Sequence, residues 1–196
     1  MSAYKGFFNQ SIREYFYGDI ESCMEVSRRK QINDPDFQKT GGLNFTAGLV
    51  IFCVIEVLTG FYKGKEFPKS DEIADFLQRY FSKHNDLFKD LAFCKKFYEV
   101  FRHGLVHEWS PKACSVDMNF SDKYLLKTII GEGGTVLLQI NIPAMFEITK
   151  KSFDDYELDL DNGNYVAEFD IRYNNIIKND YSEMEILKQM FINQEK

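Results

Sequence analysis

The sequence lacks the excess of basic residues that marks many nucleic-acid-binding proteins. Its 24 Lys and Arg are outnumbered by 30 Asp and Glu, which gives a formal net charge of −6. Such a balance provides no general electrostatic attraction to nucleic acid or to an anionic membrane. Any anionic substrate must therefore be bound by a local basic patch.

Proline is scarce and the cysteines form no recognisable motif. With only four prolines and no Pro- or Ser-rich tract, the chain has no obvious disordered linker. Cys23, Cys53, Cys94 and Cys114 are scattered without a C-x-x-C spacing, which predicts neither a zinc site nor a disulfide framework. The first residues lack the apolar region of a signal peptide. We therefore expect a cytoplasmic protein with reduced thiols.

Apolar and aromatic residues, by contrast, are abundant. The 44% hydrophobic content, with 19 Phe and 11 Tyr, is enough for one folded domain with a substantial core. Residues 43–62 are nearly uncharged and long enough to span a bilayer. Glu56 lies within that run, however, and an unpaired carboxylate in hydrocarbon is costly. We expect a buried helix of a bundle, no membrane association, and a partner for Glu56.

Helical periodicity dominates the first half of the chain. Apolar residues recur every four positions from Tyr4 to Met24, which predicts a helix over 4–30. Further helices are predicted over 43–62, from Ser70 as the N-cap, and from 85–86 to a point between Gly104 and Pro111.

The second half is mixed. Residues 124–130 and 135–142 are rich in β-branched and aliphatic side chains and flank a glycine-rich turn at 131–134, which predicts a β-hairpin. Residues 113–120 suggest a short additional strand, and Pro143 suggests the start of another helix. Residues 165–193 are ambiguous, alternating like a strand at first and helical later. The acidic run 153–161 is interpreted as a solvated face.

These elements predict a mainly α protein. We expect a helical bundle core over residues 1–112, with a β-hairpin-containing extension and C-terminal helix over 113–196 packed on it as one compact unit.

Two of the three histidines, His103 and His107, fall in one short window beside Arg102. An imidazole can move a proton near neutral pH, and a guanidinium can hold phosphate oxygens, so the combination suits phosphodiester chemistry. On an ideal helix, Arg102 and His107 point about 140° apart. They converge only if the helix breaks at Gly104 or if two subunits share the site. Cations that stabilise a helix C-terminus are the simpler interpretation.

The segment Tyr98-x-x-Phe101-Arg102-His103-Gly104-Leu105-Val106-His107 resembles the Arg-x4-His motif of HEPN domains. The resemblance covers about residues 4–112 and leaves the β-containing region unmatched. It implies a HEPN-like bundle and a metal-independent endoribonuclease, active as a homodimer without a cofactor. In that family's terms, His107 is the general acid/base, Arg102 binds the scissile phosphate and His103 orients the pair.

The resemblance also implies a biological setting, namely a bacterial stress, toxin–antitoxin or phage-defence system with RNA as substrate and an antitoxin or defence protein as a further partner. Lys95, Lys96 and Lys112 are candidate RNA-binding residues close to the motif. A non-catalytic RNA- or protein-binding dimerisation module is the alternative. A metal site built from Glu99, His103 and His107 is a third interpretation, but the H-E-x-x-H pattern is absent and we predict no metal.

Overall fold

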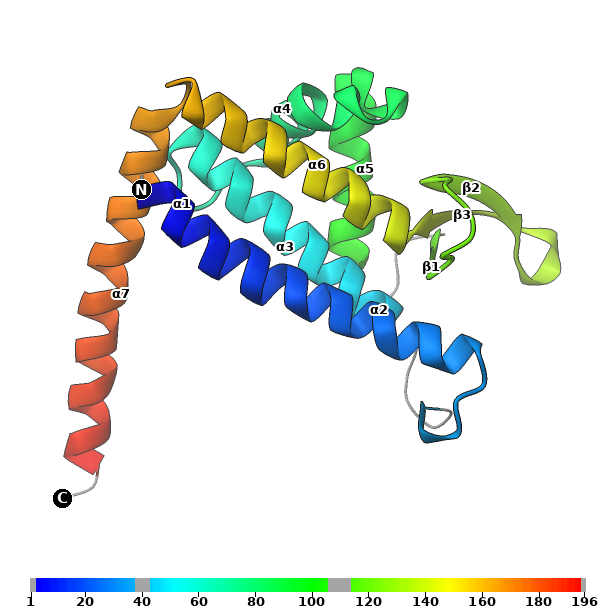
Figure 1. The fold of residues 1–196 in the computed structure, drawn as a ribbon, viewed down its shortest axis with the longest axis horizontal. Helices are drawn as coiled ribbons and strands as arrows, with labels where there is room; N and C mark the ends of the chain where they lie inside the picture. The colour runs from blue at the N-terminus through cyan, green and yellow to red at the C-terminus, as the bar shows by residue number, and fades with distance from the viewer. Residues whose placement is uncertain (1–2, 38–42, 106–113, 195–196) are drawn as a thin grey trace.

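The computed structural model describes residues 3–37, 43–105 and 114–194 (Figure 1). It is mainly helical with one small sheet, as predicted. The main helical elements are α1 (Ala3–Phe7), the π-helical stretch η1 (Phe8–Tyr17), α2 (Gly18–Gln31), α3 (Asn44–Lys63), α4 (Ser70–Tyr80), α5 (Leu91–His103), α6 (Ile142–Asp161) and α7 (Val166–Gln194). Short 3-10 turns lie at η2 (Pro35–Phe37), η3 (Phe81–Lys83), η4 (Asp86–Lys89) and η6 (Glu132–Gly134). The strands are β1 (Cys114–Asp117), β2 (Leu126–Ile130) and β3 (Val136–Asn141).

The first helix is continuous through α1, η1 and α2, which confirms the helix predicted over 4–30. Its ten-residue π-helical middle was not predicted. The buried positions step from Ile12 to Tyr17 and then to Ile20, so a spacing of five residues occurs inside the π-helical stretch. Because a π-helix takes more residues per turn than an α-helix, the core-facing seam moves from the predicted Phe16 to Tyr17.

Helix α3 occupies the middle of the bundle, packed against α2, α4, α6 and α7. By length and composition it could cross a membrane, but 61% of its most apolar stretch is buried inside the protein. That burial favours the interpretation of α3 as a core helix. Its C-terminus is closed by Gly64, whose positive φ of 64° suits a residue without a side chain.

An aromatic cluster joins the N-terminal helix to α3, α6 and α7. Phe8 is fully buried, with its ring centroid 5.7 Å from that of Phe61, 5.0 Å from Phe153 and 5.3 Å from Phe169. These are edge-to-face contacts, which aromatic quadrupoles favour over a face-to-face sandwich. Residues from both halves of the sequence therefore build one core.

The acidic run on α6 is not simply a solvated face, which corrects the sequence interpretation. All five of its carboxylates form ion pairs with cations from other elements: Asp154 and Glu157 with Arg13, Asp155 with Lys83, Asp159 with Arg79, and Asp161 with Lys5. Helix α6 therefore holds the N-terminal helix and the end of α4 against the bundle by ion pairs as well as by apolar contacts.

The predicted hairpin is confirmed, with β2 antiparallel to β3 and a turn at 131–134. Strand β1 is the predicted short strand, and it pairs with β3 in parallel to give the order β1-β3-β2. The sheet lies between α5 and α6 in the chain and extends from one end of the bundle (Figure 1).

The predicted starts of two helices were wrong. The backbone cap of α4 is Lys69 rather than Ser70, because the Glu72 carboxylate accepts a hydrogen bond from the Lys69 amide at 2.8 Å. Helix α5 begins at Leu91 rather than at 85–86, after the short 3-10 turn η4. Residues 166–194, whose pattern was ambiguous, form one helix, α7. Val166, Phe169, Tyr173 and Ile176 pack toward the core at helical spacing, and this stripe outweighs the alternation in the sequence.

Candidate functional site

The motif helix α5 begins at a well-formed cap and ends at the motif. Asp90 accepts hydrogen bonds from the amides of Ala92 and Phe93 at 2.8 and 3.3 Å, satisfying two free donors of the first turn. The apolar seam through Phe97 and Phe101 is buried in the bundle. Arg102 therefore lies in the last turn, beside the buried seam, where a cation is favoured by the helix dipole.

Arg102 is bound by Glu56 of α3. The Arg102 Nε donates to Glu56 Oε1 at 2.6 Å, and the Tyr98 hydroxyl donates to the same oxygen at 2.6 Å. Tyr98 and Arg102 are one turn apart on α5, so both reach the same carboxylate. The side chains of Arg102 and Glu56 are 26% and 25% exposed, so the pair is partly shielded from water. This confirms the expectation that Glu56 has a partner.

The cluster has a defined charge state. The hydrogen bond that Arg102 donates to Glu56 raises the pKa of Arg102 above its already high value, so the guanidinium is always charged. Burial, together with the bond to Glu56, raises the pKa of the Tyr98 phenol. Within the described residues, no partner is bonded to the two terminal nitrogens of Arg102. One edge of the guanidinium is thus fixed by protein, while the two terminal nitrogens keep donors for a pair of oxygens on an anion such as phosphate.

Gly104 does not break the helix. Its φ of −60° and ψ of −46° are right-handed helical, and residues 104–105 continue in helical geometry. Gly104 therefore does not provide the helix break that would let Arg102 and His107 converge. His107 and Lys112 lie outside the described residues, and His103 is the last residue of α5, with its side chain outside the description.

Close packing fixes the end of α5 against the rest of the protein. A side-chain carbon at Gly48 of α3 would lie 3.2 Å from Ile142 and 3.4 Å from Leu105. The glycine therefore lets α3, the end of α5 and the start of α6 approach one another. This places the motif near the junction between bundle and sheet.

The two described candidate lysines are engaged in ion pairs. Lys95 bridges to Asp71 of α4 at 2.6 Å, and Lys96 pairs with Glu99 of its own helix at 2.9 Å. Lys95 precedes Arg102 by seven residues, so it lies on nearly the same side of α5, about 10 Å away along the axis. An RNA strand would have to replace the exposed carboxylate of Asp71 and the partly buried carboxylate of Glu99, and at least the exposed pair can be replaced at small cost.

No group of three or more metal-ligating side chains occurs among the described residues. The alternative site of Glu99, His103 and His107 depends on histidine side chains outside that description.

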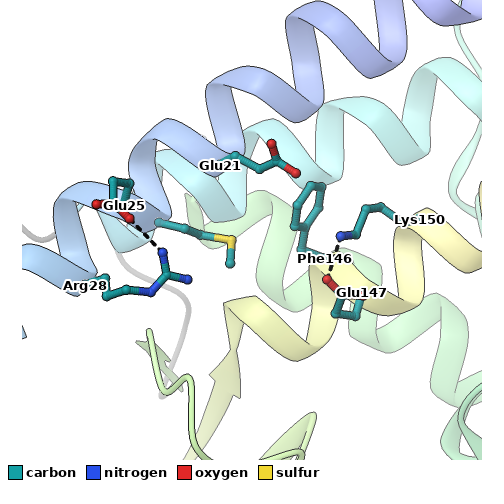
Figure 2. A pocket seen from close by; sticks show the side chains of 7 residues that line it. Glu21, Glu25, Arg28, Phe146, Glu147 and Lys150 are labelled. Carbon is teal, nitrogen blue, oxygen red and sulfur yellow. Dashed lines mark hydrogen bonds and ion pairs between the residues drawn. The ribbon is translucent and has the colours of Figure 1, made fainter.

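A hollow of about 420 Å³ lies between α2 and α6 (Figure 2). Its cations are already paired, Arg28 with Glu25 at 2.7 Å and Lys150 with Glu147 at 2.6 Å. Glu21 adds a further carboxylate to the lining. The hollow therefore carries a net negative charge and does not suit an anionic ligand.

Sequence reasoning missed a second cavity, of about 500 Å³, where the turn after η3, the loop before β2 and the first half of α6 meet. His84 lines it, and its Nε2 is 2.9 Å from Asp155 Oδ2, so a carboxylate orients the imidazole. Lys123 and Lys151 also line this cavity, and neither forms an ion pair within the described chain. No local pattern could reveal this group, because His84 and Asp155 are 71 residues apart.

No family model, curated protein or solved structure matches this chain significantly. The functional interpretation therefore depends on the motif and its geometry.

Proposed function

We propose that this protein is a HEPN-like, metal-independent endoribonuclease in which Arg102 binds the scissile phosphate. The observation that supports this most is the fixed guanidinium. Glu56 and Tyr98 hold its position from the core side, and its terminal nitrogens have no partner among the described residues. A preoriented donor pair favours charge that develops on phosphate oxygens during cleavage.

In this proposal His107 transfers the protons. It accepts the proton of the 2′-hydroxyl as that oxygen attacks phosphorus, and the departing 5′-oxygen takes up the proton that the imidazole then carries, directly or through water. The products are a 2′,3′-cyclic phosphate and a 5′-hydroxyl, with no metal or oxidant required. His103 helps to orient the pair, and the active form is a homodimer.

The Glu56 carboxylate has a consequence for substrate binding. Because it neutralises Arg102, the pair carries no net charge, and the protein as a whole is acidic. Phosphate must therefore be recognised mainly through the geometry of the guanidinium fork and through nearby cations such as Lys95. RNA binding should be weak and strongly reduced by salt.

RNA cleavage in the presence of EDTA tests the proposal, with wild-type protein compared with Arg102→Ala and His107→Ala. Both variants should lose cleavage by about a hundredfold or more, since each removes a group acting on the transition state. Arg29→Ala is the matched control, because Arg29 is exposed and pairs with Glu25 within its own helix. Equal cleavage by all four proteins, or none by wild-type across varied RNAs, contradicts the enzyme function.

We further propose that the nuclease serves a bacterial stress, toxin–antitoxin or phage-defence system. Induced wild-type protein should then slow bacterial growth, and Arg102→Ala should not. Normal growth at matched expression of both proteins would argue against a toxin.

A non-catalytic RNA- or protein-binding module is the second candidate. The Arg102–Glu56 ion pair favours it, because the arginine is satisfied without any phosphate. Binding of RNA by wild-type protein with unchanged RNA length would support this function over cleavage.

A further inference from the structure

The C-terminal half of α7 extends away from the helical bundle. The helix has 29 residues, which corresponds to about 44 Å. Its first half packs on the core through Phe169, whose ring stacks on Phe61 at 4.8 Å. Tyr173 and Ile176 continue this packing, and the C-terminal half of the helix then projects from the bundle (Figure 1). Every residue from Ser182 to Asn193 is exposed.

This projecting segment, residues 182–193, is unusually apolar for an exposed helix. Six large hydrophobic side chains in it are 40–62% exposed: Met184, Ile186, Leu187, Met190, Phe191 and Ile192. At 100° per residue, all of these except Ile192 fall within an arc of about 160°, while Glu185, Lys188 and Gln189 lie on the other side. Met184, Leu187 and Phe191 have the i, i+3, i+7 spacing of a helix–helix seam.

A helix of this kind needs a partner. Helices are stabilised mostly by packing of an apolar face, and the described part of the chain leaves the apolar face of this segment open to solvent. The six side chains expose on the order of 600 Å² of apolar surface, as large as the largest patches found on typical monomers. The area also approaches the roughly 800 Å² that each partner buries in a standard interface.

We propose that residues 182–193 bind the same segment of a second copy of this chain, forming an antiparallel helix pair. A membrane surface does not fit, because the polar face carries Lys188 and Glu185 rather than a row of cations. Glu183, Glu185 and Lys188 leave the segment nearly neutral, so two copies do not repel each other strongly. A two-fold axis that pairs a surface patch with the same patch on a second subunit is the commonest symmetry of soluble oligomers.

Glu183 determines the direction of pairing. It lies within the apolar arc, at the N-terminal end of the segment. Parallel helices would place the two Glu183 carboxylates opposite each other in an apolar seam, where like charges are costly. Antiparallel helices put them at opposite ends, where each remains in water. This interface is separate from the motif helix, and it supplies the contact through which the homodimer of the proposed function forms.

Sedimentation of the full chain tests the proposal. Wild-type protein should sediment at twice the 23.0 kDa chain mass. The double variant Leu187→Glu/Phe191→Glu should weaken association about a hundredfold or more, because it places unpaired charges in the seam. The matched control is Gln189→Glu/Asn193→Glu, which adds the same charges at the same spacing outside the apolar arc. It should remain dimeric, and circular dichroism should show all three proteins folded.

Cysteine crosslinking provides the geometric test. Leu187→Cys, near the middle of the antiparallel seam, should form a disulfide-linked dimer on mild oxidation, and Gln189→Cys should not. A monomeric wild-type, a dimer that survives Leu187→Glu/Phe191→Glu, or equal crosslinking at both positions would each overturn the proposal. Arg102→Ala should leave the dimer intact, so loss of cleavage and loss of this interface are distinguishable.

Discussion

The ion pair between Glu56 and Arg102 allows a quantitative test of the site. The two charged groups are joined at 2.6 Å, and each side chain is about one-quarter exposed. For charges about 4 Å apart at an effective dielectric constant of about 20, the attraction is about 4 kcal/mol. Desolvation of both groups offsets most of this. We therefore expect a net coupling of about 1–2 kcal/mol.

A double-mutant cycle measures this coupling. Glu56→Gln, Arg102→Gln and the double variant are compared with wild-type by equilibrium urea unfolding, and the free energies of unfolding are combined. The amide introduced by Glu56→Gln keeps an acceptor for the Tyr98 hydroxyl, so the cycle isolates the charge interaction. Arg102→Gln should cost more than Glu56→Gln, because it leaves a half-buried carboxylate bonded to the hydroxyl alone.

The matched control is the pair of Glu185 and Lys188 on α7. Its atoms are 3.2 Å apart, and its side chains are about 60% exposed. Such a pair should couple by less than about 0.5 kcal/mol. If the coupling between Glu56 and Arg102 does not exceed that of the control pair, the two side chains are not held together as described, and the argument for a preoriented guanidinium fails.

Three further predictions concern the core, the acidic helix and the thiols. Phe8→Ala should lower the free energy of unfolding by about 3–5 kcal/mol, whereas Phe67→Ala, at a side chain that is 82% exposed, should change it by less than about 0.5 kcal/mol in the same urea titration. Asp159 is partly buried, but hydrogen bonds from Tyr80 and Arg79 outweigh that burial and hold its pKa below the usual value. Its stabilising effect is thus present above about pH 4 and lost as the pH falls through the lowered pKa, so Asp159→Asn should reduce the acid-induced drop in melting temperature. Burial raises the pKa of the Cys94 thiol to about 12, so this residue should resist thiol labelling at about pH 8 until the protein unfolds; rapid native labelling, located by mass spectrometry, would contradict its burial.

Sequence periodicity predicted most of the helices because their apolar faces are continuous and their ends carry glycine or acidic caps. The hairpin was predictable from the glycines between two β-rich runs. Pairing between β1 and β3 was not, because it joins residues about 24 positions apart with no local signal. The start of helix α7 was ambiguous because aromatic residues near Tyr165 also alternate, and only the packing on α3 distinguishes the two patterns.

The candidate site was predictable in its parts but not in its assembly. Arg102 stood out as an arginine beside histidines, and Glu56 as a carboxylate in an apolar helix. Their contact spans 46 residues, and a single sequence carries no information on which cation meets which carboxylate. The same limit concealed the contact of His84 with Asp155.

The π-helical stretch of the first helix has a consequence for chain length. Its buried positions step by four from Phe8 to Ile12, by five to Tyr17, and then by three to Ile20. Removing one residue between Ile12 and Tyr17 would convert the step of five into four, the ordinary α-helical interval. Both ends of the helix would still face the core. We therefore expect the chain to tolerate the deletion of one residue between Ile12 and Tyr17 without loss of its fold.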